Sequence, residues 1–358
     1  ERLQLFVRSI DIVPLFEYMM KNNATDLHLT ADSAPIFRVN RQLLKTDGRA
    51  LSRDAVKALV LGTLTPDRRE AFVRSREIYY PFFIPGLGRW RVSAFQQRGN
   101  IEAVFHNVDT YVPTIEDLDL PEILHNIAVT QGGLVCVTGG AGTGKSTTIA
   151  AMIRTINREQ QRVIVTIEDP IQYIHENERS VIKQREVGFD TSSVAEGLSH
   201  VLRQDPDVIV IDDVPDAEVM DMAMRAAESG RLVIVTMHTT DAITTVRRII
   251  GMYPEHRRLS VLQSVAAALR AVISQRIAPT IDGRGAMMVP EILTMTEPMR
   301  QAIRTNKIEQ LYNLMAGAPG CITLDAGLRS ALLRGRIDFD TASQFARDPE
   351  GLRRAVAV

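Results

Sequence analysis

The sequence predicts an α/β fold in which a small α+β domain precedes a larger parallel sheet covered by helices. A glycine-rich run, Gly-Gly-Ala-Gly-Thr-Gly-Lys-Ser, lies at residues 139–146, between an apolar run and a helix-favouring run. Beyond residue 114, apolar runs alternate with helical patterns, which is typical of a parallel sheet buried on both faces. Before residue 109, the runs alternate polar and apolar residues, as strands with one solvated face do. With 358 residues the chain is long enough for two hydrophobic cores.

The first 109 residues are predicted to form the α+β domain, and residues 110–113 are predicted to be a linker. Period-two alternation predicts strands at residues 26–30, 36–40, 78–83, 89–96 and 102–106. Helical periodicity predicts helices at residues 12–20 and 51–61.

Residues 114–358 are predicted to form the second domain. Its predicted strands are residues 134–138, 163–167, 208–211 and 232–236, and the helices between and after them are residues 146–157, 193–202, 217–228 and 241–250. Residues 264–276 and the region 325–345 are predicted to be further helices, which build a C-terminal helical layer.

The composition is that of an ordinary globular protein, with 45% hydrophobic and 24% charged residues. Its net charge of −1 provides no basic field, so nucleic acid is not an expected partner. No stretch approaches the roughly 18 apolar residues of a membrane span, so we expect no direct insertion into a membrane and a cytoplasmic location. Cys136 and Cys321 alone cannot form a disulfide framework or a four-cysteine zinc site.

The run at residues 139–146 is a complete Walker A motif, Gly-Gly-Ala-Gly-Thr-Gly-Lys-Ser. Its glycines let backbone N–H groups curl around phosphate oxygens, Lys145 can reach the β- and γ-phosphates, and the Ser146 hydroxyl is placed to bind Mg²⁺. The sequence therefore predicts that the chain binds a nucleoside triphosphate. The candidate nucleotide-binding residues are Gly139, Gly140, Ala141, Gly142, Thr143, Gly144, Lys145, Ser146 and Thr147.

In a doubly wound sheet the ligand lies beyond the carboxyl ends of the strands, so the residues after each apolar run are candidates for the site. Glu168 and Asp169 can hold water or Mg²⁺, although solvated acids in an Asp-Pro turn would give the same pattern. Asp212 and Asp213 end a Walker B pattern, in which the first carboxylate supports Mg²⁺ and the second orients the attacking water. His238 can sense the γ-phosphate, and the alternative is a structural histidine.

Several longer motifs resemble, in the same order, those of secretion-type ATPases, specifically the type IV pilus retraction motors PilT and PilU. They are Thr166-Ile-Glu-Asp-Pro-Ile, Gln184-Arg-Glu-Val, Leu202-Arg-Gln-Asp-Pro-Asp, Ala226-Ala-Glu-Ser-Gly and Met237-His-Thr-Thr. The resemblance begins at Ala24-Thr-Asp-Leu-His-Leu-Thr and runs to the last helices. Other segments look closer to PilU, the accessory motor: Arg91-Val-Ser-Ala-Phe, Arg185-Glu-Val-Gly-Phe-Asp, Pro279-Thr-Ile-Asp-Gly-Arg and Ala346-Arg-Asp-Pro-Glu-Gly-Leu-Arg.

The resemblance implies a homo-hexamer in which each subunit pairs a PAS-like N-terminal domain with a RecA-like P-loop ATPase domain. It implies hydrolysis of ATP with Mg²⁺, coupled to pilus disassembly through an inner-membrane platform protein and alongside a PilT-type paralogue. The chain would then be cytoplasmic and peripheral to the inner membrane. Two alternatives stay open: a nucleotide-binding ring component that hydrolyses weakly and regulates a partner ATPase, or the assembly ATPase of a related type II secretion system.

The sequence departs from the family at the Walker B acids. Where the family usually has Gly-Glu-x-Arg-Asp, this chain has Asp212-Asp213-Val214-Pro215-Asp216. Asp213 is one methylene shorter than the glutamate base, so its carboxylate falls more than about 1 Å short, a displacement that can cost about a hundredfold in rate. Asp212, by contrast, restores the carboxylate that supports Mg²⁺ in ordinary Walker B motifs.

The arginines of the family are only partly present. Arg89, Arg91 and Arg98 match a region that, by resemblance, faces the nucleotide and stabilises charge on the transferring phosphoryl group. A solvent-exposed arginine-rich strand is the alternative interpretation. His106 stands where the family has a further arginine, and it carries a full charge only when protonated. The segment from Met299 to Arg304 resembles a PilT motif tied to retraction and can be a docking surface or a solvated helix face.

Overall fold

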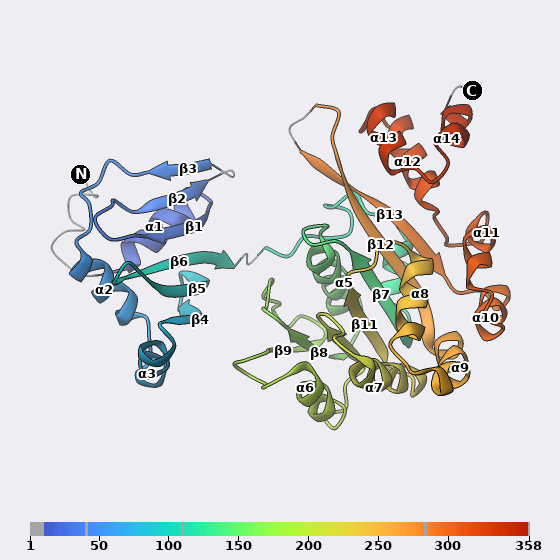
Figure 1. Cartoon of the computed structure of the whole chain (residues 1–358), viewed down its shortest axis with the longest axis horizontal. Coiled ribbons are helices and arrows are strands. Elements are labelled where there is room, and N and C mark those ends of the chain that lie inside the picture. The colour runs from blue at the N-terminus through green and yellow to red at the C-terminus, as the bar shows by residue number, and fades with distance from the viewer. Residues whose placement is uncertain (1–10, 40–41, 109–110, 283–284, 357–358) are drawn as a thin grey trace. The chain divides into compact units, whose positions relative to one another are not determined.

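The structure is a computed structural model that describes residues 11–39, 42–108, 111–282 and 285–356 (Figure 1). The chain divides into two compact units, Glu1–Thr110 and Tyr111–Val358. Four features of the sequence lie wholly or partly outside the described residues: the first ten residues, the end of the strand predicted at 36–40, the domain boundary predicted at 109, and Gly-Arg at 283–284.

The first unit is a six-stranded antiparallel sheet with helices packed on one face. Its strands are β1 (Ala24–Leu29), β2 (Ile36–Val39), β3 (Gln42–Lys45), β4 (Glu77–Ile84), β5 (Gly88–Gln97) and β6 (Asn100–Val108), and its helices are α1 (Val13–Lys21), α2 (Arg53–Gly62) and α3 (Pro66–Ser75). The strand order is β3-β2-β1-β6-β5-β4. Phe16 of α1 stacks on Trp90 of β5 with ring centroids 4.0 Å apart, and Phe105 joins the same buried cluster. The aromatic core therefore fixes α1 against the middle of the sheet.

The second unit is a seven-stranded sheet in which only the last strand is antiparallel. Its strands are β7 (Gly133–Gly139), β8 (Val163–Glu168), β9 (Val181–Glu186), β10 (Val208–Ile211), β11 (Leu232–Met237), β12 (Leu269–Pro279) and β13 (Ala286–Thr294). They lie in the order β13-β12-β7-β11-β10-β8-β9. Every residue of β7, β10 and β11 is buried, as expected of strands that helices cover on both sides.

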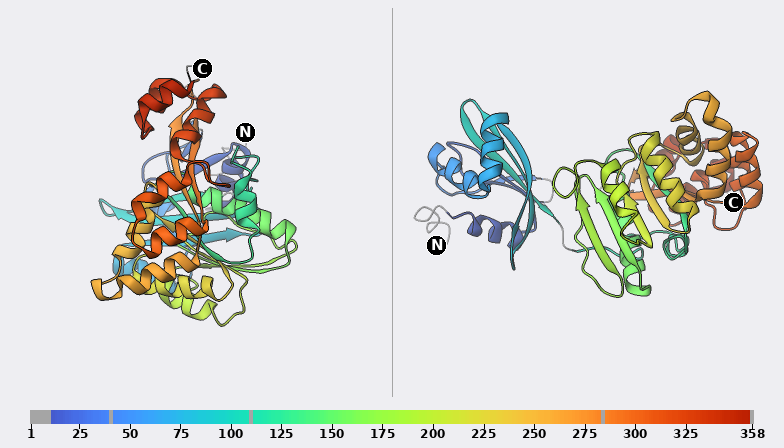
Figure 2. Two further views of the ribbon diagram at one scale, coloured as in Figure 1. Left: turned by 90° about the vertical axis from the view of Figure 1, so that its right-hand side faces the viewer. Right: turned by 90° about the horizontal axis from the view of Figure 1, so that it is seen from below.

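Helices cover both faces of this sheet (Figures 1 and 2). The helices are α4 (Ile123–Ala128), α5 (Lys145–Glu159), α6 (Val194–Val201), α7 (Ala217–Glu228), α8 (Ala242–Gly251), α9 (Arg258–Ala268), α10 (Glu297–Arg304) and α11 (Leu311–Met315). Val135 and Val137 of β7 pack in one cluster with α4 and α5. Leu134 and Cys136, which point the other way, pack in a second cluster with α6 to α11. Side chains that alternate along β7 thus pack into two separate hydrophobic cores, one on each face of the sheet.

The C-terminal helices form two groups instead of one layer. Helices α10 and α11 belong to the core around α9. Helices α12 (Leu324–Leu333), α13 (Phe339–Phe345) and α14 (Pro349–Val356) pack instead on the hairpin of β12 and β13, through a small cluster that includes Val289, Leu328 and Leu352 (Figure 2). The helices predicted over residues 325–345 are therefore present, but the C-terminal helices form two separate groups and not the single predicted layer.

The helix predicted at residues 264–276 is wrong in its second half. Helix α9 ends at Ala268, and β12 continues from Leu269 to Pro279. This strand is buried between β7 and β13, so its apolar residues do not alternate, and periodicity alone cannot separate such a run from a buried helix. Strands β3, β9 and β13 and helix α3 also lie in stretches for which the sequence predicted no element.

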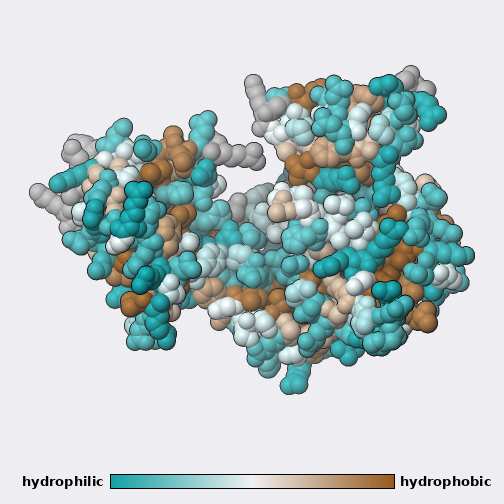
Figure 3. Space-filling view, viewed as in Figure 1, coloured by the Kyte–Doolittle hydropathy of each residue, from teal (hydrophilic) through white to brown (hydrophobic). Residues whose placement is uncertain are grey.

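The hydropathy of the surface can be followed on one face of the molecule (Figure 3). Hydrophilic residues dominate the face seen in Figure 3, and the apolar patches between them are small. Within the described ranges, no helix is both long enough and apolar enough to cross a membrane.

Candidate active site

The phosphate-binding loop joins β7 to α5, and its glycines are required by its shape. Gly142 and Gly144 have φ angles of 76° and 86°, in the left-handed region that favours glycine. At Gly139 a Cβ atom would lie 2.5 Å from Thr143 Oγ1 and 2.6 Å from the backbone oxygen of Gln275. The loop therefore rests on β12, which carries Gln275, with no room for a side chain at its first position.

Lys145 begins α5 and folds back over the loop. Its Nζ donates hydrogen bonds of 2.9 Å and 3.0 Å to the carbonyl oxygens of Gly139 and Gly140. Burial lowers the pKa of Lys145, while the carboxylates of Asp212 and Asp213 act in the opposite direction. The ammonium group is thus held between the loop and the Walker B acids, where the phosphates of a nucleotide would need a positive charge.

One hydroxyl group organises the Walker B acids at the end of β10. Thr236 of the neighbouring strand β11 donates a hydrogen bond to Asp212 Oδ1 at 3.0 Å, and its hydroxyl oxygen accepts one from the backbone N–H of Asp213 at 2.7 Å. Burial raises the pKa of Asp212. Asp213 has a φ of 58°, a left-handed conformation that aspartate tolerates better than most residues.

Asp213 and His238 lie together at the ends of β10 and β11. His238 Nε2 is 3.9 Å from Asp213 Oδ2, and the two side chains are 59% and 57% exposed. This distance is too long for a hydrogen bond but permits an ion pair when the imidazole is protonated. Both side chains therefore face solvent at the ligand side of the sheet, next to the half-buried Asp212.

Glu168 is the best-supported carboxylate of the site. Its Oε1 accepts hydrogen bonds from Thr166 Oγ1 at 2.6 Å and from Gln184 Nε2 at 3.1 Å. Burial raises the pKa of Glu168, and the nearby charge of Asp212 adds to the effect. Glu168, Asp212 and Ser146 line one narrow pocket beside α5. Asp169 is exposed and does not line this pocket.

Comparison with known proteins identifies the family. A family model described as "Type II/IV secretion system protein" matches residues 103–284. The type IV pilus ATPase PilU of Pseudomonas aeruginosa is 37% identical over 346 residues, which cover 96% of this chain and 91% of the relative. The type IV pilus retraction ATPase PilT of the same organism is 36% identical over 343 residues, covering 95% and 99%. The chain belongs to the type IV pilus retraction ATPase family.

Solved structures agree with this membership. A crystal structure of the pilus retraction motor PilT with bound ADP superposes with a TM-score of 0.90 at 34% identity, and covers 97% of this chain and all of that one, 100%. The ATPase DotB of Legionella pneumophila, at 23% identity and a TM-score of 0.80, shares the fold. The predicted α/β class with a P-loop ATPase domain is confirmed. Identities of 37% and 36% do not separate PilU from PilT, so the closer likeness to PilU stays a prediction.

The three family-type arginines lie in the first unit and do not form one group. Arg89 and Arg91 are two residues apart on β5, on the sheet face opposite buried Trp90 and Val92. Arg98 is at the turn between β5 and β6, with a φ of 49°. Seven residues of strand separate it from Arg91, which is about 23 Å at about 3.3 Å per residue. The extended strand therefore holds Arg91 and Arg98 well apart along the sheet.

His106 has a partner on its own sheet. It lies beside Arg91 on β5 and Asp26 on β1, and Asp26 in turn lies beside Arg38 on β2. His106 Nδ1 is 2.8 Å from Asp26 Oδ1, and Arg38 Nε is 3.3 Å from Asp26 Oδ2. Burial raises the pKa of Asp26, but hydrogen bonds from His106 and Thr25 outweigh it and hold this pKa below its usual value. The histidine is thus fixed in a row of charged groups across the sheet.

A second pocket near the phosphate loop was not predicted. A cavity of about 350 Å³ lies beside the phosphate loop, and Thr143, Gly144 and Thr147 form one of its walls. Its other walls come from residues 117–120, from Ile277 and residues 286–288 of the β12–β13 hairpin, and from Arg336. These segments are distant in sequence and carry no motif, so only the fold brings them together.

Proposed function

We propose that this chain is the ATP-hydrolysing subunit of a type IV pilus retraction motor and acts as an accessory motor. The observation that carries the proposal is that Ser146, Glu168 and Asp212 line one narrow pocket, and that the charge of Asp212 acts on Lys145 at the phosphate loop. A hydroxyl, two carboxylates and an ammonium group at the ends of parallel strands suit a triphosphate, its cation and a water molecule. The names of the relatives, a pilus ATPase and a pilus retraction ATPase, supply the biological process.

In this proposal Ser146 and Asp212 hold Mg²⁺. A hydroxyl and a carboxylate are the oxygen ligands that this cation prefers, and the Asp212 carboxylate is already fixed by Thr236. When bound, Mg²⁺ neutralises charge on the β- and γ-phosphates. The backbone N–H groups of residues 140–147 and the ammonium group of Lys145 bind the phosphates, and the cavity on the other side of Thr143 and Thr147 takes the base and ribose.

The two remaining acids divide the work on the attacking water. Glu168 positions the water and accepts its proton, since burial makes this carboxylate more basic than an exposed one. Asp213 orients the same water, and His238, exposed beside it, senses the γ-phosphate. Arg89 and Arg91 are the arginine candidates for stabilising charge on the phosphoryl group, and Arg98 is assigned to a separate contact.

The assembly and partners are proposed from the family resemblance. The subunit forms a homo-hexamer, works with a PilT-type paralogue, and meets the pilus through an inner-membrane platform protein, which makes it cytoplasmic and peripheral to that membrane. The accessory role has its own support in the chain. A shortened acid at position 213 suits a subunit whose binding energy helps neighbouring subunits to close.

The Asp213 carboxylate is expected to limit the rate. Asp213→Glu should raise kcat about tenfold, since it restores the reach of the family's glutamate, and Asp213→Asn should lower kcat with little change in nucleotide affinity. Steady-state phosphate release measures both. Asp205→Asn is the matched control, because Asp205 is an exposed aspartate with a similar φ of 51° outside the site. A parental rate in Asp213→Asn would mean that Glu168 or Asp212 orients the attacking water instead.

The biological role is tested in cells. With this protein as the only retraction ATPase, pilus retraction should be weak, and restoring a PilT-type partner should return full force. Retraction force is measured with optical tweezers in cells that carry the chain or its Lys145→Ala variant. Full force without the partner would make this chain the principal motor. No change in force in any background would favour the alternative of a secretion ATPase.

A further inference from the structure

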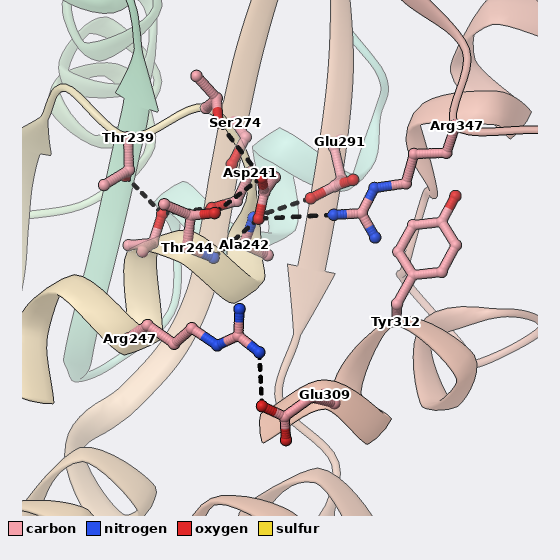
Figure 4. A network of polar contacts seen from close by, with 12 residues as sticks. Thr239, Asp241, Ala242, Thr244, Arg247, Ser274, Glu291, Glu309, Tyr312 and Arg347 are labelled. Carbon is pink, nitrogen blue, oxygen red and sulfur yellow. Dashed lines mark hydrogen bonds and ion pairs between the residues drawn. The ribbon is translucent and has the colours of Figure 1, made fainter. Parts of the chain in front are cut away.

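The segment that carries His238 runs directly into a polar network at the start of α8 (Figure 4). Asp241 caps this helix: its Oδ1 accepts a hydrogen bond from the backbone N–H of Thr244 at 2.8 Å, and its Oδ2 accepts one from the Thr244 hydroxyl at 2.9 Å. The hydroxyl groups of Thr239 and Thr245 are 2.7 Å apart. The three residues from His238 to Thr240 are therefore fixed at one end by β11 and at the other by the first turn of α8.

A second carboxylate reaches the same helix end from β13. Glu291 is 2% exposed, and its Oε1 accepts a hydrogen bond from the backbone N–H of Ala242 at 2.8 Å. Its Oε2 has no hydrogen-bond partner among the described residues. Burial raises the pKa of Glu291, and the charge of Asp241 adds to the effect. Two acids thus crowd one helix end, and they need a positive neighbour.

Arg347, between α13 and α14, supplies that positive charge. Its Nη2 is 3.7 Å from Asp241 Oδ1, and its charge also acts on Glu291. The guanidinium group lies 4.2 Å from the centre of the Tyr312 ring, a cation–π distance that orients it. The backbone N–H of Arg347 donates to Asp325 Oδ1 of α12 at 2.8 Å. The arginine is therefore anchored in the C-terminal helices while its charge acts at α8.

A second contact joins the same helices to the other end of the site. Arg334 and Arg336, which follow α12, lie 3.3 Å and 3.9 Å from the carboxylate of Asp119. Asp119 and Arg336 both line the cavity to which we assign the base. Helices α12 to α14 thus have ion pairs beside both the base cavity and the His238 segment.

We propose that Arg347 is a positioning residue for ATP hydrolysis, which acts through Asp241. By holding the start of α8, it sets where His238 lies relative to Asp213, and it links the C-terminal helices to that segment. The inference rests on the proposed function, because it assigns a role in the turnover of the same site. Linkage requires the effect to run both ways, so a change at His238 on hydrolysis also acts on α12 to α14.

Arg347→Met tests the charge while it keeps the aliphatic packing against Tyr312. We expect kcat to fall about threefold to tenfold, which lies within the range seen for residues that couple sites without touching the ligand, while the affinity for ADP stays within about twofold. Arg347→Lys should recover at least about half of kcat. Arg329→Met is the control, because Arg329 is an exposed arginine on α12, and it should match the parent. Parental kcat in Arg347→Met would overturn the proposal.

A double-mutant cycle tests the route through Asp241. Asparagine caps helices as well as aspartate does, so Asp241→Asn removes the charge and keeps the cap. In that background, Arg347→Met should change kcat by less than about twofold. An equal loss in both backgrounds would contradict the route.

Amide hydrogen exchange provides a readout that does not depend on turnover. Without nucleotide, residues 238–246 should exchange faster in Arg347→Met than in the parent and in Arg329→Met. If the parent protein fails to hydrolyse ATP, the proposed function fails, but the exchange still decides whether Arg347 positions the segment. Unchanged exchange would refute the link by itself.

Discussion

Lys145→Ala should abolish ATP turnover and weaken nucleotide binding while the fold stays intact. In the structure the Lys145 ammonium group lies over the loop and close to the charges of Asp212 and Asp213. Losing a charged hydrogen bond to phosphate costs roughly 1.5–3 kcal/mol of binding free energy, which is about tenfold to a hundredfold in affinity. We expect kcat to fall by at least about a hundredfold, since the charge on the γ-phosphate grows in the transition state.

Titration with a fluorescent nucleotide and steady-state phosphate release measure the two effects. Lys183→Ala is the matched control, because Lys183 is an exposed lysine on β9. Thermal unfolding should show similar midpoints for both variants and the parent. Undiminished affinity in a folded Lys145→Ala protein would refute the phosphate-loop assignment.

Glu168→Gln should lower kcat by about a hundredfold to ten-thousandfold and leave nucleotide affinity nearly unchanged. The glutamine oxygen can accept the same hydrogen bonds from Thr166 and Gln184, so the substitution removes the base without disturbing its place. Phosphate release and nucleotide titration separate the two effects. Glu178→Gln, at an exposed glutamate, is the control. Full activity of Glu168→Gln would move the role to Asp213.

The pH dependence of kcat provides an independent test of Glu168 as the general base. A base works only when it is deprotonated, and burial raises the pKa of Glu168. Activity should therefore fall, as the pH is lowered, at a higher pH than an exposed carboxylate would give. The Glu168→Gln variant should lose this step of the pH–rate profile.

The sequence predicted those parts of the site that follow from strand ends. Parallel strands end at one edge of a sheet, so their positions along the chain are enough to assign Glu168, Asp213 and His238 to a common edge. The residues that hydrogen-bond to these acids could not be predicted. Gln184, which donates to Glu168, lies on β9, a strand that the sequence did not predict, and Thr236, which donates to Asp212, has no feature that distinguishes it from other strand residues.

For the arginines, closeness within a sequence motif does not mean closeness in space. A shared motif grouped Arg89 and Arg91 with Arg98, and in the structure an extended strand places Arg98 at the far end of β5 from the other two, so their common role stays a prediction. The cavity beside Thr143 was not predicted for another reason. Residues 286–288 reach it through the pairing of β13 with β12 and of β12 with β7, and residues 269–276 of β12 were predicted as a helix.

Strand β12 is also the backbone that joins the C-terminal helices to the nucleotide loop. The Gln275 carbonyl lies against Gly139, Gln275 Nε2 donates to Thr148 at 2.5 Å, and Ser274 accepts a hydrogen bond from Thr138 at 2.9 Å. Helices α12 to α14 rest on the far part of the same strand and its hairpin partner. A tensile load applied to these helices would therefore be transmitted along one continuous strand to the floor of the phosphate loop, and the affinity for nucleotide would vary with the force that the subunit bears.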